Sequence, residues 1–356
     1  MNLKILITVA SITPGSGLSK YILSLSSILC QLKYQVIVLT THDDNPEYEK
    51  DILAKTGKIT FVSFGNYQKV NKYFHVLQYI RQQKPNIIIN NYNAVIQFLL
   101  PFISRKTKVV HIIHSTTKEF YRIATINAKY VDGWIVPTSA MKSDLNTYSQ
   151  SKYRNKIQVI PHGVELPSFH YSKQSLIKEL VFVGVLYDHK GVLILPEIIH
   201  KLLKKHEEFH FTIIGGGKEK GFLENELRNE LSEGIVTMTG VITSKEVYRH
   251  LSEADIFVYP THIDSFGLVI AEAMINGTVP IVTHLKGITD NLIDNNENGY
   301  LLKQDDVDSF VEHISLLLHN EELLTSLKLA AKEKAESHFS LEVMKKNYQN
   351  YLESLY

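Results

Sequence analysis

Short apolar runs alternate along this chain with longer amphipathic stretches. Apolar runs bounded by polar or turn residues are typical of buried parallel strands. The first half contains such runs at residues 4–9, 35–40, 59–63, 86–90, 108–114, 133–137 and 157–161. Apolar residues recur at helical spacing over 18–32, which predicts a helix between the first two strands. Together these elements predict a parallel, doubly wound sheet.

The pattern begins again after a polar bridge at residues 165–178. Further strands are expected at 180–185, 209–214, 235–239, 256–259 and 280–283. Further helices are expected at 191–205, 220–231, 244–253, 268–274, 306–319, 321–338 and 341–355. The predicted fold class is therefore α/β, with two Rossmann-like, doubly wound parallel-sheet domains, 1–165 and 166–340, that face each other across a cleft. In such folds the carboxyl ends of the strands form the default site.

Composition is that of an ordinary globular protein, with 44% hydrophobic and 21% charged residues. No apolar run reaches the roughly 18 residues of a membrane-spanning helix. The apolar stretch at the N-terminus is too short for a signal sequence and is better interpreted as a first strand, which indicates a cytoplasmic protein. Cys30 is the only cysteine, which excludes an internal disulfide and a cysteine-rich zinc site.

Charge is distributed unevenly between the two halves. Residues 1–160 hold 20 Lys and Arg against 8 Asp and Glu, and residues 161–356 hold 18 against 29, so that +12 and −11 give the formal net charge of +1. A basic half indicates that the first domain meets something anionic. Nucleic acid, an anionic membrane surface and a phosphate-bearing acceptor would each fit, and solubilising lysines are the structural alternative.

Two glycine loops follow predicted strands. The first, Pro14-Gly15-Ser16-Gly17, opens a helix, where glycine lets a phosphate or sugar approach the backbone. Lys20 stands in the place of the third glycine of a dinucleotide-binding loop, and no acidic residue closes the second strand, so a dinucleotide site is not expected. The second loop, Gly215-Gly216-Gly217-Lys218, lacks the ending of a P-loop, which disfavours nucleotide hydrolysis. Simple tight turns are the alternative for both loops.

Two kinds of side chain near expected strand ends could meet a ligand. Lys190 lies between a strand and a helix, where a cation can neutralise a phosphate, and a solvated lysine is the alternative. His111 and His114 lie three residues apart in one expected strand, so they face opposite sides, which argues against joint metal binding. A neutral imidazole at His114, nearer the strand's carboxyl end, could hydrogen-bond a sugar hydroxyl in the cleft.

Residues 261–280 predict a loop that runs into a short helix. Gly277 and Pro280 end this helix. A helix that begins at the carboxyl end of a strand presents free backbone N–H groups and the positive end of its dipole, which suit a phosphate. Asp264 in the loop and Glu272 in the helix are the best-placed carboxylates, one for a sugar hydroxyl and the other for a ribose.

In this order the motifs resemble those of the retaining glycosyltransferases of family four, which have the GT-B fold. The resemblance spans nearly the whole chain and rests on five features. They are the glycine loop 14–17, His114, Ile157-Gln-Val-Ile-Pro-His-Gly-Val164, Phe182-Val-Gly184 with Asp188-His-Lys-Gly191, and the stretch from Asp264 to Gly277, which matches the family's E-x7-E signature.

The resemblance implies a role for each matching position. Lys190 would bind the donor diphosphate, Glu272 the nucleotide ribose and His114 the sugar near its 6-position. Backbone N–H groups would serve the transferred sugar at Ser265, Phe266 and Gly267, and the phosphates at Leu268 and Val269. The remaining donor-binding positions are Gly15, Gly17, Gly216 and Val241. The catalytic set is His114, Asp264 and Lys190, and a last helix over 341–356 would pack back on the N-terminal domain.

Two positions depart from the family pattern. Val185 stands where the family usually has an arginine, which removes a diphosphate contact worth about 1.5–3 kcal/mol unless Lys20 or Lys218 supplies it. Asp264 stands for the first signature glutamate and is shorter by one methylene. Both departures favour the alternative of a non-catalytic GT-B subunit that binds an acceptor or a partner glycosyltransferase.

The predicted function is that of a metal-independent, retaining glycosyltransferase. It would move a sugar from a nucleoside diphosphate sugar, with a UDP-sugar favoured, to a hydroxyl of a glycan or lipid-linked acceptor in bacterial cell-surface polysaccharide or glycolipid synthesis. No cofactor and no metal are expected, because no carboxylate motif for a metal-held donor is present. A sugar-nucleotide epimerase of similar architecture stays open.

The basic first domain also predicts attachment to an anionic membrane surface, on the inner face of the cell membrane. Aromatic residues surround Lys69 and Lys72, as expected for peripheral attachment, and a helix core is the alternative interpretation. These aromatic residues are Tyr67, Tyr73, Phe74 and Tyr79. Nucleic-acid binding is not expected because the basic half has no recognition module, and a homo-oligomer stays open.

Overall fold

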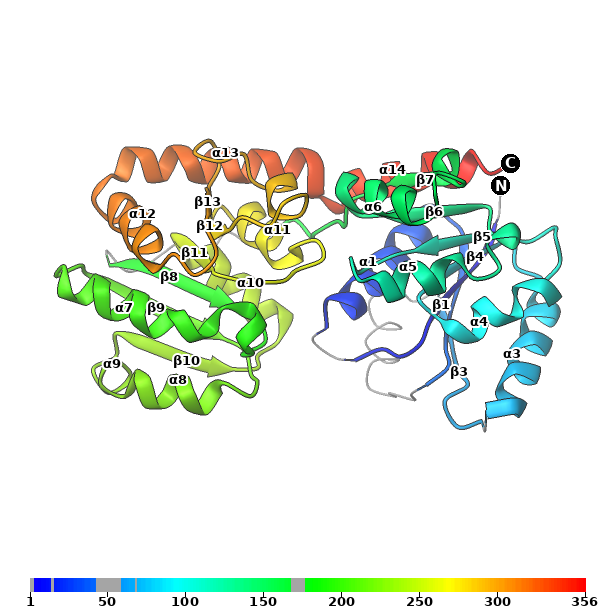
Figure 1. The fold of residues 1–356 in the computed structure, drawn as a ribbon, viewed down its shortest axis with the longest axis horizontal. Helices are drawn as coiled ribbons and strands as arrows, with labels where there is room; N and C mark the ends of the chain where they lie inside the picture. The colour runs from blue at the N-terminus through cyan, green and yellow to red at the C-terminus, as the bar shows by residue number, and fades with distance from the viewer. Residues whose placement is uncertain (1–2, 14–15, 43–58, 68, 168–176) are drawn as a thin grey trace. The chain divides into compact units, whose positions relative to one another are not determined.

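The computed structural model describes residues 3–13, 16–42, 59–67, 69–167 and 177–356. The chain divides into two compact units (Figure 1), each built on its own sheet. Unit 1 comprises Met1–Gly163 and Leu341–Tyr356, and unit 2 comprises Val164–Ser340. The expected boundary at 165 lies two residues from this division, and the polar bridge after it falls largely outside the described residues.

Unit 1 is built on a seven-stranded parallel sheet in the order β3-β2-β1-β4-β5-β6-β7. Its strands are β1 (Lys4–Val9), β2 (Gln35–Thr40), β3 (Ile59–Ser63), β4 (Ile87–Asn91), β5 (Lys108–Ile112), β6 (Gly133–Val136) and β7 (Ile157–Val159). Successive side chains of β1 enter two different cores, with Ile5 and Ile7 in one and Leu6 in the other. This alternation follows from the two-residue period of a strand and places helices on both faces of the sheet.

The helices of unit 1 come from both ends of the chain. They are α1 (Gly17–Gln31), α3 (Lys69–Gln83), α4 (Ala94–Leu99), α5 (Lys118–Thr125), α6 (Ser139–Tyr148) and α14 (Leu341–Glu353), with 3-10 turns η1 (Leu100–Phe102), η2 (Ala128–Tyr130) and η3 (Arg154–Lys156). The last helix, α14, buries Met344, Tyr348 and Leu352 in the core that α1 also lines. The C-terminal segment therefore belongs to the same compact unit as the N-terminal sheet.

Unit 2 is built on a six-stranded parallel sheet in the order β10-β9-β8-β11-β12-β13. Its strands are β8 (Lys178–Val183), β9 (Phe209–Ile214), β10 (Val236–Gly240), β11 (Ile256–Tyr259), β12 (Val279–Thr283) and β13 (Tyr300–Leu302). Its helices are α7 (Leu195–Lys204), α8 (Lys220–Glu226), α9 (Arg228–Ser232), α10 (Ser244–Glu253), α11 (Leu268–Ile275), α12 (Val307–His319) and α13 (Glu321–Phe339), with 3-10 turns η4 (Asp188–Lys190), η5 (Val192–Ile194) and η6 (Thr289–Asn291).

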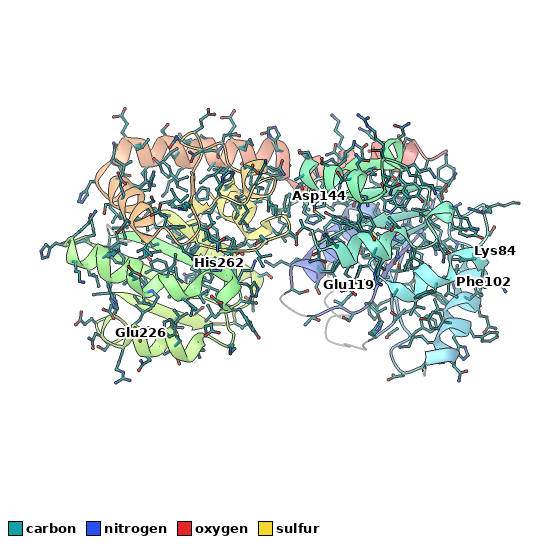
Figure 2. The ribbon with its side chains drawn as sticks, viewed as in Figure 1. Lys84, Phe102, Glu119, Asp144, Glu226 and His262 are labelled. Atoms are coloured by element: carbon teal, nitrogen blue, oxygen red, sulfur yellow. The ribbon has the colours of Figure 1, made fainter. Side chains whose placement is uncertain are left out.

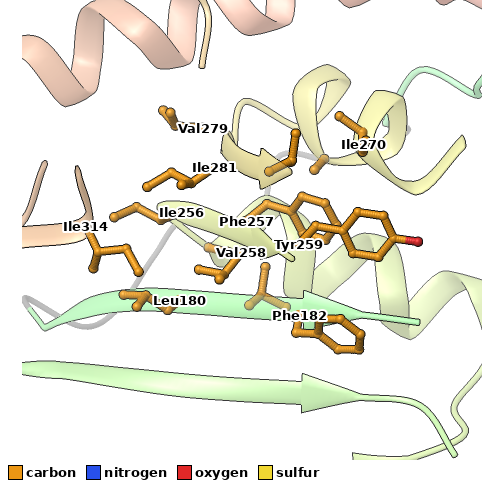
Figure 3. Packing of buried hydrophobic residues seen from close by; sticks show 14 of the residues in the cluster. Leu180, Phe182, Ile256, Phe257, Val258, Tyr259, Ile270, Val279, Ile281 and Ile314 are labelled. Carbon is orange, nitrogen blue, oxygen red and sulfur yellow. The ribbon is translucent and has the colours of Figure 1, made fainter. Parts of the chain in front are cut away.

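The core of unit 2 is centred on β11. Figure 3 shows side chains of β11 between those of β8 and β12, with Tyr259 beside Phe257 and Phe182. Helix α11 contributes Ile270 to the same core. Its buried side chains span most of the helix, so α11 is fixed against the sheet, and the position of its N-terminus follows from this packing.

The predicted fold class, with two doubly wound parallel sheets, is confirmed, and several element boundaries differ. The strand expected at 108–114 ends at Ile112, and the one expected at 157–161 ends at Val159. The helix expected at 191–205 is a 3-10 turn followed by α7, which has a proline in its first turn. The helix expected at 220–231 divides into α8 and α9, and β13 was not predicted.

Candidate active site

Two loops meet in unit 2 at the carboxyl ends of β8 and β11. The backbone carbonyl of His189, in η4, accepts hydrogen bonds from the amides of His262 at 3.0 Å and Ile263 at 3.3 Å. Gly191 ends η4 with a φ of 68°, and a Cβ on it would lie 1.8 Å from the carbonyl oxygen of Pro260. The close approach of the two loops therefore requires glycine at this position. Figure 2 labels His262, which lies on the β11 loop.

This arrangement brings the predicted residues Lys190 and Asp264 together. Lys190 Nζ donates to Asp264 Oδ2 at 2.9 Å and to the carbonyl oxygen of Ile263 at 3.1 Å. Both side chains of the pair are 16% exposed. The Tyr259 hydroxyl, from the end of β11, also donates to Asp264 Oδ2 at 2.9 Å. The lysine that the resemblance assigns to the diphosphate is thus held by a carboxylate and a buried tyrosine.

The other carboxylate oxygen of Asp264 caps the turn that precedes α11. Asp264 Oδ1 accepts hydrogen bonds from the amides of Ser265 at 2.7 Å and Gly267 at 3.0 Å, with a longer contact to Phe266 at 3.4 Å. These are the amides that the resemblance assigns to the transferred sugar. In this structure they face Asp264, so binding a sugar would require them to exchange partners, and that role stays a prediction.

The first turn of α11 keeps two backbone donors. Helix α11 begins at Leu268 after Gly267, which has a φ of 85°. The carbonyl of Gly267 accepts from Ile270 and Ala271, whereas no described residue accepts from the amides of Leu268 and Val269. Together with the positive end of the helix dipole, these two donors suit the oxygens of a phosphate.

The surroundings of Asp264 favour its ionised form. Burial raises the pKa of this carboxyl, but the charge and hydrogen bond of Lys190, with donors from Ser265 and Tyr259, outweigh that effect and hold the pKa below its ordinary value. Burial, together with the nearby Asp264 charge, raises the pKa of Tyr259 well above its ordinary value. The phenol therefore keeps its proton and donates it to Asp264 in a hydrogen bond.

Glu272 lies deeper than the sequence suggests. It is 4% exposed on α11. Tyr248, on α10, hydrogen-bonds to it, and the pKa of that phenol is raised well above its ordinary value, first by burial and then by the Glu272 charge. A ribose hydroxyl bound by Glu272 would join or replace this contact.

The second glycine loop packs against the segment that follows β8. A Cβ on Gly215, which has a φ of 140°, would lie 1.8 Å from the carbonyl oxygen of Gly184. The carbonyl of Gly216 accepts from the amide of Leu186 at 2.9 Å. Val241, at 80% exposure, lies beside Gly216, since a Cβ there would come within 3.0 Å of its Cγ2. The predicted donor-binding positions Gly216 and Val241 are therefore neighbours, and the loop serves the close approach of two chain segments.

In unit 1, His114 lies two residues beyond β5. Its Nε2 lies 2.9 Å from Asn91 Oδ1, while Asn91 Nδ2 donates to the carbonyls of Thr8 and Ile89. These bonds fix the amide orientation, so Nε2 carries the proton and Nδ1 is left as an acceptor. Burial lowers the pKa of His114 to about 3. The neutral imidazole that the sequence predicts can thus accept a hydrogen bond from a hydroxyl.

Aromatic rings hold His114 in place. The ring of Tyr21 lies 4.8 Å from that of His114 and 4.4 Å from that of His162. The Tyr21 hydroxyl hydrogen-bonds to that of Tyr348 on α14. The C-terminal helix therefore supports the histidine from within unit 1.

His111 belongs to a separate network, as its spacing predicts. It is 2% exposed, and its Nδ1 accepts from Asn90 Nδ2 at 3.1 Å, whereas His114 pairs with Asn91. Asn90 and Asn91 are neighbours on β4 and face opposite sides of the sheet. Burial lowers the pKa of His111 to about 3. Among the described residues, no group of three or more His, Cys, Asp or Glu could hold a metal ion.

The first glycine loop is described only in part. Gly15 lies outside the described residues. Gly17 is the first residue of α1, whose N-cap Ser16 accepts from the amide of Ser19 at 3.1 Å. A Cβ on Gly17 would meet no described atom within 4 Å, so no described neighbour requires glycine here.

The sequence did not indicate the residues that support the site. Tyr259, Tyr248, Asn91 and Tyr21 lie in apolar or helical runs and carry no motif. Tyr259 offers one usable signal, since it is the last residue of a buried strand and precedes Asp264 by five positions. Side chains at carboxyl ends of parallel strands line the site edge, and this rule would have found Tyr259 and Asn91.

Two family models match consecutive parts of the chain. Residues 15–167 match Glycosyltransferase Family 4, and residues 170–334 match Glycosyl transferases group 1. These ranges cover nearly the whole chain between them. The protein belongs to the family-four glycosyltransferases, and the resemblance drawn from the motifs is confirmed.

Two curated relatives are identical to the chain at about a quarter of the aligned residues. An alpha-monoglucosyldiacylglycerol synthase of Streptococcus pneumoniae is 25% identical over 320 residues, which are 80% of this chain and 72% of that protein. A 2-deoxystreptamine N-acetyl-D-glucosaminyltransferase of Niallia circulans is 25% identical over 193 residues, 54% of this chain and 49% of that protein. The chain thus spans about half of the length of the latter relative.

Solved structures confirm the GT-B fold. A glycosyltransferase from Rickettsia africae ESF-5 has a TM-score of 0.83 at 17% identity and covers 99% of this chain and 98% of its own. Anabaena Alr3699/HepE in complex with UDP has a TM-score of 0.81 at 15% identity and covers 99% of this chain and 100% of its own.

Proposed function

We propose that this glycosyltransferase is a retaining enzyme that works without a metal and transfers a sugar from a UDP-sugar to a hydroxyl of a glycan or lipid-linked acceptor. The observation that carries the proposal is a group of hydrogen-bond donors in unit 2 that suit a phosphate. Lys190 and the amides of Leu268 and Val269 lie at the carboxyl ends of β8 and β11, with Asp264 holding the lysine.

The donor and acceptor classes draw on relatives with described products. One structural neighbour was solved with UDP, and two relatives are named for diacylglycerol glucosylation in Streptococcus pneumoniae and for amylovoran biosynthesis in Erwinia amylovora. A UDP-sugar and an acceptor in glycolipid or polysaccharide synthesis are therefore the first pair to assay.

The proposed reaction exchanges one bond at the anomeric carbon for another. The bond from that carbon to the diphosphate oxygen breaks, and a bond to the acceptor oxygen forms on the same face of the sugar. The leaving diphosphate takes the acceptor's proton. Lys190 and the two amides would stabilise the negative charge that develops on the diphosphate, which is the largest contribution that fixed donors can make.

Two further positions have stated roles in this proposal. His114, neutral and with Nδ1 free to accept, would receive a hydrogen bond from a sugar hydroxyl. Lys218 would supply part of the charge that Val185 does not, since it lies in the glycine loop that contacts the segment after β8 and is 80% exposed. Its ion pair with Glu219 is long, at 3.8 Å, so it can turn toward a phosphate.

The test is a melting-temperature screen with UDP, GDP and ADP, followed by transfer assays with the sugar nucleotide of the base that binds. We expect UDP to raise the melting temperature most, transfer to persist in EDTA, and NMR of the product to show the anomeric configuration of the donor. No response to any nucleotide and no transfer would disprove the proposal. Nucleotide binding without transfer to any acceptor would instead favour a non-catalytic subunit.

A further inference from the structure

One edge of unit 1 is formed by a segment of the chain that carries basic residues and no carboxylates. Between Asp51 and Glu119 the sequence has no aspartate or glutamate but ten lysines and arginines. This segment includes α3, α4 and η1. Arg81, Lys84, Arg105 and Lys106 form no ion pair with any described residue. Their charge is therefore available to an anionic partner.

Three phenylalanine rings project from the same edge. Phe74 on α3, Phe98 on α4 and Phe102 in η1 are 65%, 52% and 60% exposed. Clusters of solvent-exposed apolar side chains mark interaction sites more often than single exposed ones do.

The contacts between these helices place the rings along one seam. The ring of Tyr73 lies 6.5 Å from that of Phe98, and Arg81 donates to the carbonyl of Phe102 at 3.4 Å. Helix α3 therefore runs alongside α4 and η1. Phe74 and Arg81 are seven residues apart and share a face of α3. Figure 2 shows Lys84 and Phe102 at the same end of unit 1. We name this surface the phenylalanine edge: Phe74, Phe98 and Phe102 with Arg81, Lys84, Arg105 and Lys106.

The phenylalanine edge differs from the aromatic group that the sequence predicted. Tyr73 and Tyr79 pack against the core of unit 1, so the core interpretation is right for both. Tyr67 lies against His75 with ring centroids 4.4 Å apart. Lys72 Nζ donates to the carbonyl of Thr41 at 2.5 Å. Of the predicted aromatic residues, Phe74 alone belongs to the edge.

We propose that the phenylalanine edge docks on an anionic lipid bilayer. Phenylalanine has no hydrogen-bonding group, so moving its ring from water to the boundary between headgroups and acyl chains lowers the free energy. The four cations would at the same time attract anionic headgroups. A nucleic acid would attract the same cations, but these rings offer no donor or acceptor to a base edge. No helix of the described chain is long and apolar enough to span a bilayer.

Flotation with vesicles tests the proposal. The vesicles are phosphatidylcholine alone or one part phosphatidylglycerol to two parts phosphatidylcholine. One double variant, F98S/F102S, removes the rings, and another, R105Q/K106Q, removes charge. Matched controls in unit 2 are Leu329→Ser, at a residue that is 66% exposed on α13, and K204Q/K205Q at exposed lysines.

The wild type should bind the anionic vesicles and not the neutral ones. Removing two cations should weaken binding about thirtyfold, from about 1 kcal/mol for each basic residue, and removing two rings at least about tenfold. The controls should bind like the wild type. Higher salt should weaken the wild type more than R105Q/K106Q.

Three outcomes would overturn the proposal. Equal binding to both vesicles, or edge variants that bind like the controls, would remove the bilayer as partner. Tighter binding to a single-stranded oligonucleotide than to the vesicles would assign the charge to nucleic acid. A change from dimer to monomer in F98S/F102S, with unchanged vesicle binding, would assign the edge to a second copy. Both variants should keep the nucleotide response of the wild type, so failure here is distinct from failure of the proposed transfer reaction.

Discussion

The two sheets place different chemistry at the ends of their strands. In unit 1, neutral polar groups lie near the strand ends, where His114 is hydrogen-bonded to Asn91 and His111 to Asn90. In unit 2, a buried ion pair of Lys190 with Asp264 lies at the strand ends, and Tyr259 supports it with a hydrogen bond. Neutral amides and imidazoles suit hydroxyl groups, which are uncharged, whereas a fixed cation and helix amides suit phosphates. The strand ends of unit 1 therefore suit hydroxyl groups, and those of unit 2 suit phosphates.

The same difference predicts that the two units respond to acid in different pH ranges. In unit 1, burial holds the pKa of His111 and His114 at about 3, below the ordinary value of about 6.5. In unit 2, the pKa of Asp264 is held below its own ordinary value by Lys190 and the neighbouring donors, so the ion pair stays charged in mild acid. Mild acid should therefore affect unit 1 first.

The largest expected effect comes from Lys190→Met, which keeps the aliphatic length and removes the charge. The diphosphate would lose its fixed cation, and Asp264 would keep a buried charge without its partner. We expect kcat/KM for transfer to fall by about 10²–10³-fold, in the range for removing one donor to a developing anion, together with loss of the UDP-induced rise in melting temperature. Lys204→Met, on the exposed end of α7, is the matched control. Unchanged nucleotide binding in Lys190→Met would place the diphosphate elsewhere.

The second prediction concerns the stability of unit 1 in mild acid. Unfolded His111 takes up a proton below about pH 6.5, whereas folded His111 does so only near pH 3. The unfolded state therefore binds more protons in this window, and folding stability is lost as the pH falls. One such histidine lowers the free energy of unfolding by about 2 kcal/mol between pH 7 and pH 5.

Urea unfolding at both pH values, with hydrogen exchange read separately on peptides of each unit, measures this loss. His111→Asn places an amide oxygen near the position of Nδ1 and cannot titrate, so it should recover about 2 kcal/mol of the acid effect. His206→Asn, at an exposed histidine of unit 2, is the matched control. If unit 2 opened first on acidification, the contrast between the two sites would be wrong.

The third prediction concerns whether the length of the Asp264 side chain suits the site. Asp264→Glu keeps the charge, but one further methylene moves the carboxylate away from the amides of Ser265 and Gly267. We expect about a tenfold loss of transfer, because a charge-assisted contact of about 1.4 kcal/mol is displaced, with Lys190 still paired. Steady-state kinetics measure the loss of transfer, and the melting temperature shows whether the ion pair with Lys190 still stabilises the fold. Faster transfer by the Asp264→Glu variant would show instead that the aspartate weakens a site built for glutamate.

Most of the fold could be predicted because its signals are local. Buried parallel strands are continuous apolar runs, and β1, β2, β3, β9 and β11 begin and end where the sequence predicts. Prediction failed where backbone geometry rather than composition ends an element. Ile113 is apolar and its amide still donates to the carbonyl of Ile135, yet β5 ends at Ile112. Strand β13, with three residues, is too short for its pattern to be distinguished from a loop.

The candidate site could be predicted only for residues in motifs. Lys190 and Asp264 were both expected in the site, but their ion pair was not, because it joins loops 74 residues apart through the hydrogen bonds of the His189 carbonyl. The amides before α11 were expected to be free, and the sequence holds no sign that Asp264 accepts from them. Supporting residues such as Tyr259 are selected by packing, which motifs do not report.

The smallest effect expected is that of Tyr259→Phe. The ring is 2% exposed and packs beside Phe257 and Phe182, so phenylalanine fits the same space. What is lost is the hydroxyl that donates to Asp264 Oδ2, a bond to a charged group worth about 1.5–3 kcal/mol, of which Lys190 should recover a part by moving closer. We expect transfer to fall about threefold, from a net loss of about 0.7 kcal/mol.

The pKa of Asp264 should rise in the same Tyr259→Phe variant, because a donor that favours its charged form is gone, so the acid limb of the pH–rate profile should shift toward higher pH. A structural role for the hydroxyl alone would lower the melting temperature and leave that limb in place. Tyr153→Phe, at another tyrosine packed beside an aromatic ring in unit 1, should change neither the rate nor the profile.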